Sequence, residues 1–147
     1  MSRFLSRVVL PIAMVLLAAL PPPAVSDPGL SAKDTEQVQK VIVAQIEALA
    51  EDDAERIFET TTPEVRAAIG SSGRFLAMMR GAYPMVYQPS SVTFHKPAAG
   101  QDGAWQLVEI TDREDQSWLA LFALERQPDK TWRISGCLVA PNPWLAT

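Results

Sequence analysis

The sequence predicts an α+β fold in which N-terminal helices pack on a curved antiparallel sheet. Apolar residues recur at helical spacing between residues 31 and 58, and from residue 92 onward they alternate along strands. An order of helices first and strands later is typical of α+β domains. A single amphipathic helix cannot bury its apolar stripe alone, so the later strands are expected to cover it.

The segment Ser31–Phe58 is expected to form two consecutive helices. Ser31 is the expected N-cap of the first, with Asp34 three residues later in the capping-box position. Asp52 is expected to cap the second, with Glu55 reaching back to it, so the chain should kink between the two helices. The apolar stripe of the first helix consists of Val38, Val41, Ile42, Ile46 and Leu49.

Two shorter helices are predicted next. Thr62 is the expected N-cap of the first, with Pro63 in its opening turn, and Gly70 ends it. The second contains the apolar residues between Phe75 and Met79. The segment Tyr83–Pro89 is expected to be extended or turn-like, because proline disfavours helix in the residue before it.

Strands are predicted at residues 92–96, 105–111, 117–125 and 132–139, and the last three form an antiparallel meander. The strand Ser117–Glu125 is apolar on both faces, so it is expected to lie in the interior of the sheet. Residues 97–103 are expected to form a polar turn. On the last strand, alternation places Trp132, Ile134 and Leu138 on one face and Arg133, Ser135 and Cys137 on the other.

Residues 1–26 have the pattern of a secretory signal peptide. Arg3 and Arg7 precede an apolar run to Leu20, and small residues stand before a cleavage point after Ser26. We therefore expect the leader to be cleaved and residues 27–147 to form a single α+β domain that is periplasmic or secreted. The alternative is a leader retained as an anchor, although its apolar run is short for a membrane span.

Composition argues against several classes of function. Removing Arg3 and Arg7 with the leader leaves 11 basic against 17 acidic residues, a net charge of −6. Such a domain is a poor candidate for binding nucleic acid or anionic lipid. Cys137 is the only cysteine and His95 the only histidine, so we expect no internal disulfide, no metal site and no cofactor.

Several motifs resemble known families. The helix with Gln45, Ala48 and Asp53 and the strands ending in residues 128–134 resemble the nuclear-transport-factor-2-like superfamily. The cone-shaped α+β fold of that superfamily is shared with ketosteroid isomerase and many polyketide cyclases. A closer resemblance, over residues 35–138, is to an uncharacterised bacterial family, the domain of unknown function 4864. It is carried by Gln45, Phe75, Tyr83, the strand of Trp118 and residues 132–137. The resemblance implies the fold but no activity.

Our main functional hypothesis is a non-catalytic module that binds a small apolar ligand or a protein partner. Aromatic rings on separate strands and near the open end of the cone could line its interior, namely Trp105, Trp118, Trp132, Tyr83 and Phe122. A partner could instead be a second copy bound through the open sheet face. The competing interpretation is that these rings only fill the core.

The alternative hypothesis is an isomerase or lyase that works inside the cone. Glu109 shares its face with Trp105 and, if that face is inward, could act as a base with Tyr83 or Tyr87 as hydroxyl donor. The competing interpretation is a surface ion pair between Glu109 and Arg133 or Arg126. Cys137 is interpreted as a small core residue, His95 as a surface residue, and the acidic cluster at residues 47–55 as a solvated helix face.

Overall fold

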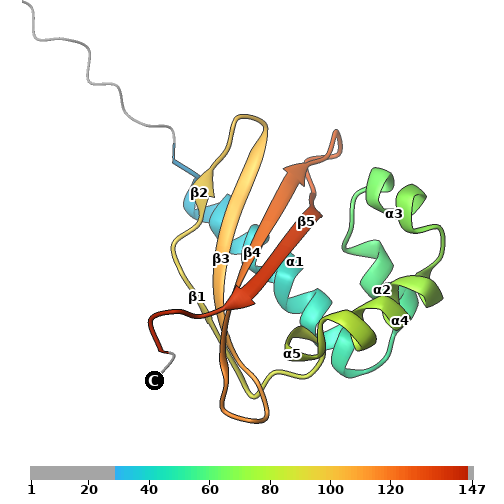
Figure 1. Cartoon of the computed structure of the whole chain (residues 1–147). Coiled ribbons are helices and arrows are strands. Elements are labelled where there is room, and N and C mark those ends of the chain that lie inside the picture. Colours follow the sequence, from blue (N-terminus) through green and yellow to red (C-terminus); the bar gives the residue numbers. More distant parts are fainter. Residues whose placement is uncertain (1–28, 146–147) are drawn as a thin grey trace, which may run out of the picture.

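The computed structural model describes residues 29–145 (Figure 1). The predicted leader, residues 1–26, lies outside the described residues. Within the described part of the chain, five helices come first and are followed by the strands of a five-stranded antiparallel sheet. The predicted α+β class, with helices packed on an antiparallel sheet, is confirmed.

Helices α1 (Ala32–Ala50) and α2 (Ala54–Glu59) form the predicted pair. Ser31 caps α1, since its hydroxyl accepts the Asp34 amide at 3.0 Å and donates to the Asp34 carboxylate at 2.9 Å. The predicted cap of α2 is wrong by one residue. Asp52 adopts a left-handed conformation with φ of 56°, which ends α1, so Asp53 caps α2 by accepting the Arg56 amide.

Helices α3 (Pro63–Ile69) and α4 (Ser72–Ala82) also follow the prediction. Thr62 caps α3, and Gly70 ends it at φ of 96°, a conformation that favours glycine. The prediction for residues 83–89 is wrong, because Pro84–Tyr87 form a short helix, α5. Pro84 occupies the first turn, where a missing amide proton breaks no helical hydrogen bond.

The sheet contains β1 (Ser91–Phe94), β3 (Gly103–Thr111), β4 (Ser117–Arg126) and β5 (Trp132–Pro141), in that order. The predicted meander of the last three strands is confirmed, and β4 lies between β3 and β5 as expected. The predicted turn at residues 97–103 also contains a two-residue strand, β2 (Ala98–Ala99), paired with β3. So short a strand leaves no alternation to detect.

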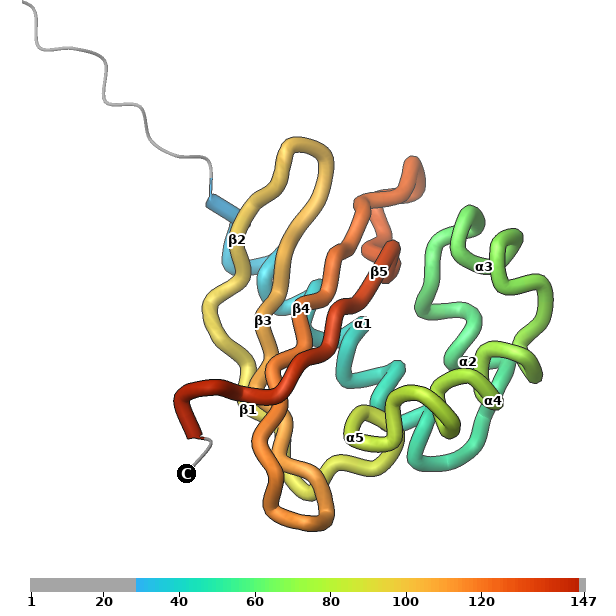
Figure 2. The backbone as a smooth tube through the Cα atoms, viewed as in Figure 1, coloured from blue at the N-terminus to red at the C-terminus, as the bar shows by residue number. Residues whose placement is uncertain are grey.

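Helix α1 crosses one face of the sheet, and α2, α3 and α4 gather on the side of β5 (Figures 1 and 2). The core lies between α1 and this inner face of the sheet. Gln106 is fully buried there, and its amide donates to the carbonyls of His95 and Leu107 at 2.6 and 2.8 Å. The core includes Val38, Ile42, Leu49, Val108, Ile110, Phe122 and Leu124.

A β-bulge in β5 reverses the predicted faces of its second half. Ala123 pairs with Gly136, whereas Leu124 pairs with Ile134, so Ser135 is the extra residue. Cys137 therefore packs against the core, and Leu138 is 72% exposed on the opposite, outer face. The prediction that Leu138 shares a face with Ile134 is wrong for this reason.

The segment joining α2 to α3 pairs with β5 beside the bulge. The Thr62 amide donates to the Ile134 carbonyl at 3.0 Å, and the Ile134 amide donates to the Thr60 carbonyl at 2.8 Å. This short parallel bridge places Thr60, Thr61 and Thr62 in the interior, where all three are buried. It fixes the helices after α1 to the edge of the sheet.

Asp52 joins the α1–α2 turn to α4 and α5. The Tyr87 hydroxyl donates to its carboxylate at 2.5 Å, and Arg80 contacts the same oxygen at 2.6 Å. The hydrogen bond from Tyr87, followed by the one from Arg80, holds the pKa of Asp52 below its usual value of 3.8. A depressed carboxyl pKa stabilises the fold at neutral pH, and this contribution is lost as the pH falls through the folded-state pKa.

The variant D52N should therefore be less stable than the wild type at pH 7, and the difference should shrink below about pH 4. Asparagine tolerates the left-handed conformation, so the change isolates the charge. Urea denaturation at pH 7 and at pH 3 measures the effect, with D102N on an exposed loop as control. An unchanged gap between D52N and the wild type at both pH values would contradict this role.

Candidate functional site

A cavity of about 160 Å³ lies between α3, α4 and the inner side of β4 and β5. None of the side chains that line it is charged. Most of its wall is apolar, formed by residues that include Val65, Ile69, Phe75, Met79, Phe122 and Ile134. The bulge and the threonine bridge shape this wall, because they set where β5 turns and where α3 begins.

A few polar groups interrupt the apolar wall, from Gln45, Thr61, Tyr83 and Ser135. The buried Gln45 amide nitrogen donates to the Thr60 hydroxyl oxygen at 3.1 Å. The hydroxyls of Thr60 and Thr61 donate to the backbone carbonyls of Ile57 and Phe58 at 2.6 and 2.7 Å. Such a wall suits an uncharged ligand with a small polar part.

The helices around the cavity are tied together by contacts outside it. The Ser72 hydroxyl at the start of α4 donates to the Glu55 carboxylate of α2. The rings of Phe58 and Phe75 pack at a centroid distance of 6.4 Å, tilted by 49°. These contacts hold α4, which supplies Phe75 and Met79 to the wall, against α2.

Cys137 contributes a thiol to the cavity wall. Burial raises the pKa of this thiol to about 12. A thiol with so high a pKa is protonated at neutral pH and is a poor nucleophile. The cavity therefore offers no activated cysteine.

Two of the five predicted ligand-contacting residues, Tyr83 and Phe122, line this cavity. The three tryptophans lie elsewhere and apart. Trp105 is 47% exposed on the outer face of the sheet. Trp118 donates to Asp112 at 2.8 Å beside a groove under α5, and the buried Trp132 donates to Asp34 at 3.2 Å.

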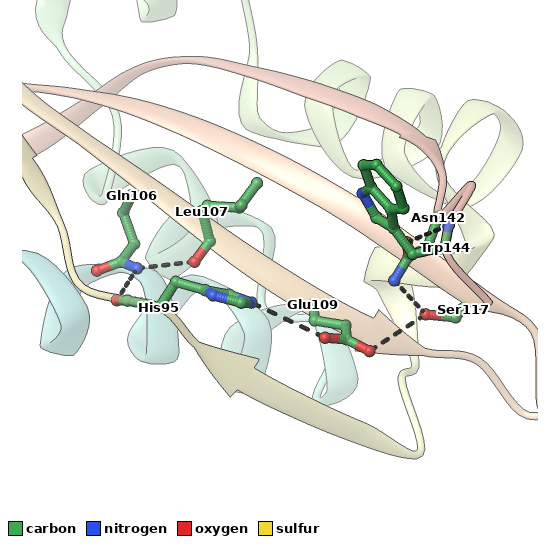
Figure 3. Close-up of polar contacts among 7 residues, drawn as sticks. All are labelled: His95, Gln106, Leu107, Glu109, Ser117, Asn142 and Trp144. Carbon is green, nitrogen blue, oxygen red and sulfur yellow. Dashed lines mark hydrogen bonds and ion pairs between the residues drawn. The ribbon is translucent and has the colours of Figure 1, made fainter.

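Glu109 lies on the outer face, away from the helices. Its carboxylate is 3.8 Å from His95 Nε2 and accepts from the Ser117 hydroxyl at 3.5 Å (Figure 3). Tyr83 and Tyr87 lie on the helix-covered side, where Tyr87 binds Asp52. The structure does not bring the proposed base together with either hydroxyl donor.

The prediction that Glu109 pairs with Arg133 or Arg126 is wrong. Arg126 lies 3.9 Å from Asp34 across the sheet end, and Arg133 donates to the Trp132 carbonyl at 2.9 Å. His95 takes their place because β1 pairs beside β3 and brings its end next to Glu109. Ser117 also meets Asn142, whose side chain donates to its hydroxyl at 3.1 Å (Figure 3).

Within residues 29–145, no group of three or more His, Cys, Asp and Glu side chains is placed to hold a metal ion. In the acidic segment, Arg56 pairs with Glu47 and Glu51 at 3.3 and 3.2 Å. No helix in the same range combines the length and apolar character that a membrane span requires.

Gln45 and Thr60 were not among the site residues predicted from the sequence. A signal was present in the periodicity, since Gln45 occupies a position of the α1 stripe between Ile42 and Leu49 where an apolar residue is expected. A polar side chain on an apolar stripe needs a partner in the interior. Thr60, the first of three consecutive threonines, supplies it.

Cys137 should react with iodoacetamide far more slowly in the folded protein than in urea. The rate follows the thiolate fraction, so the pKa that burial raises to about 12 predicts a slowing of about tenfold or more at pH 8. Intact-mass spectrometry over time measures both rates. Native labelling as fast as that of the unfolded chain would show that the thiol is not enclosed.

Comparisons with known proteins agree with this architecture. The family model described as Domain of unknown function (DUF4864) matches residues 31–147. A crystal structure of a protein of unknown function with a cystatin-like fold, from Nostoc punctiforme PCC 73102, superposes with a TM-score of 0.50 at 13% identity, covering 78% of this chain and 95% of that chain. No curated protein matches. At that identity the likeness shows the fold alone.

Proposed function

We propose that this chain, which belongs to the DUF4864 family, is a non-catalytic module that binds a small uncharged apolar ligand. The observation that carries the proposal is the cavity between α3, α4 and β5, whose wall is largely apolar and contains no charged side chain. An apolar cavity of about 150 Å³ in another protein accommodates benzene. A volume of about 160 Å³ therefore suits one aromatic ring or a short alkyl chain.

The alternative of an isomerase or lyase lacks support in the geometry. Catalysis by proton transfer needs a base within reach of the substrate and a donor on the same site. Glu109 lies across the sheet from Tyr83, and the Cys137 thiol is protonated at neutral pH. Binding without chemistry accounts for the same cavity with fewer requirements.

We also propose that the protein acts outside the cytoplasm, because residues 1–26 have the order of charged, apolar and small residues found in cleaved leaders. The mature chain would begin near Asp27. Intact mass of the protein recovered from its host's periplasm or medium tests this, and an uncleaved cytoplasmic protein would overturn it.

The variant V65F should abolish binding of a small aromatic probe while leaving the protein folded. Val65 is half-buried on α3 and lines the cavity, so a larger ring there occupies the ligand's space. We expect saturable shifts of cavity methyl resonances on toluene titration of the wild type, and at least a tenfold loss of affinity in V65F.

The matched control is A67F, which adds the same ring to an exposed position of α3. It should bind toluene like the wild type. Equal binding by V65F and A67F, or no saturable binding by the wild type, would contradict the proposed site.

A second candidate function is self-association through the outer face of the sheet. Leu107, Leu121 and Leu138 lie side by side on β3, β4 and β5, where Leu138 is exposed and the other two are half-buried. Leu138 is 72% exposed only because the bulge turns it outward. Exposed apolar surface of this kind, with polar residues at both ends, marks interaction sites.

The size of this face fits a second copy. Strands β3, β4 and β5, of 9 or 10 residues, are about 30 Å long, β1 is about 13 Å long, and neighbouring strands lie about 4.8 Å apart. The footprint of roughly 500 Å² is smaller than the 800 Å² per partner of a standard interface and fits a weak, concentration-dependent dimer. A row of leucines can also meet its own copy across a two-fold axis, because such an interface pairs the same patch of both subunits.

The variant L138D should be monomeric where the wild type is dimeric. A carboxylate in the middle of an apolar interface loses its hydration without gaining a partner. Sedimentation velocity at about 100 μM measures the state. V43D is the matched control, because Val43 is an exposed apolar residue, at 37%, on α1 rather than on the sheet. A monomeric wild type would rule out the dimer.

A further inference from the structure

We infer that the ligand of the cavity is a neutral alcohol or phenol and that the carbonyl oxygen of the Gln45 side chain receives its hydroxyl proton. The inference rests on the proposed binding function and names the chemical class that the cavity selects. Gln45 is 3% exposed and belongs to the cavity wall. The orientation of its amide group decides whether the oxygen or the nitrogen faces the cavity.

The hydrogen bonds of Thr60 fix the amide orientation. The Thr60 hydroxyl lies 2.6 Å from the Ile57 carbonyl oxygen, which can only accept, so the single hydroxyl proton is used there. At 3.1 Å from Gln45, the Thr60 oxygen can therefore only accept as well. The nitrogen of the amide must face Thr60, and its oxygen, Oε1, must face the other way.

Gln45 Oε1 is left without a protein donor. No side chain or backbone amide of residues 29–145 donates to it. In the same residues, every side-chain nitrogen or oxygen that solvent cannot reach has a hydrogen-bond partner. Oε1 is thus reachable, and the space that Gln45 lines is the cavity. The cavity presents a fixed, nearly buried acceptor.

The absence of charged side chains from the cavity wall excludes charged ligands. A carboxylate or phosphate would find no cation in the wall, and its oxygens would repel Oε1. An ammonium ion would find no carboxylate there. A ketone or a hydrocarbon would leave the acceptor unpaired. A neutral hydroxyl on an apolar body satisfies Oε1 and fills the volume.

Phenol and toluene are nearly equal in shape and differ in the hydroxyl, so the ratio of their affinities reports the hydrogen bond. Titrating both into wild type and Q45M by NMR measures this ratio. Methionine keeps the length of the side chain and removes the acceptor. We expect Q45M to lower the phenol-to-toluene affinity ratio by about tenfold or more, with toluene still bound.

The matched control is Q39M, since Gln39 lies on the same helix and bonds Gln106 outside the cavity. Its ratio should equal that of the wild type. T60V is a second variant for the case that Q45M does not fold. It removes the group that locks the amide and should lower the ratio in the same direction.

Two results would overturn the inference, and they differ from each other. If both probes bind and neither Q45M nor T60V changes their ratio, Gln45 does not select the ligand, while the proposed cavity function stands. If neither probe binds the wild type, the cavity function fails and the inference fails with it.

Discussion

The apolar stripe of α1 must be covered, and the rest of the structure depends on how the sheet does it. Val38, Ile42 and Leu49 are fully buried in the core. The sheet covers α1, and the shorter helices pack beside α1 at the side of β5. The threonine bridge to Ile134 fixes them there, and the cavity is the space that remains between them and the strands.

Most of the fold could be predicted because the longer helices and strands carry their own periodicity and most helix ends carry their own caps. Ser31, Thr62 and Gly70 mark helix ends through local chemistry, and the alternation of β3 and β4 survives in the structure. The features that the sequence did not reveal depend on single residues. Ser135 is an extra residue in β5 and exchanges the faces of Cys137 and Leu138, which no alternation pattern can indicate.

The cavity was harder to predict than the fold, because its wall combines residues from α1, α3, α4, β4 and β5. Aromatic content suggested a lining by tryptophans, but Trp105, Trp118 and Trp132 lie in three separate surroundings. The informative signal was instead the polar Gln45 on an apolar stripe. The strand register also determines which face Glu109 occupies, since its pairing with Leu119 places it on the outer face of the sheet.

The central claim is that the space between α3, α4 and β5 is a binding site for a neutral hydroxylated molecule. A crystal structure of the protein grown with 4-bromophenol tests it directly, because the bromine atom can be located by its anomalous scattering. The account predicts a bromine peak inside the cavity and the phenol oxygen within hydrogen-bonding distance of Gln45 Oε1. A cavity filled by its own side chains, or bromine found only on the outer face of the sheet, would contradict it.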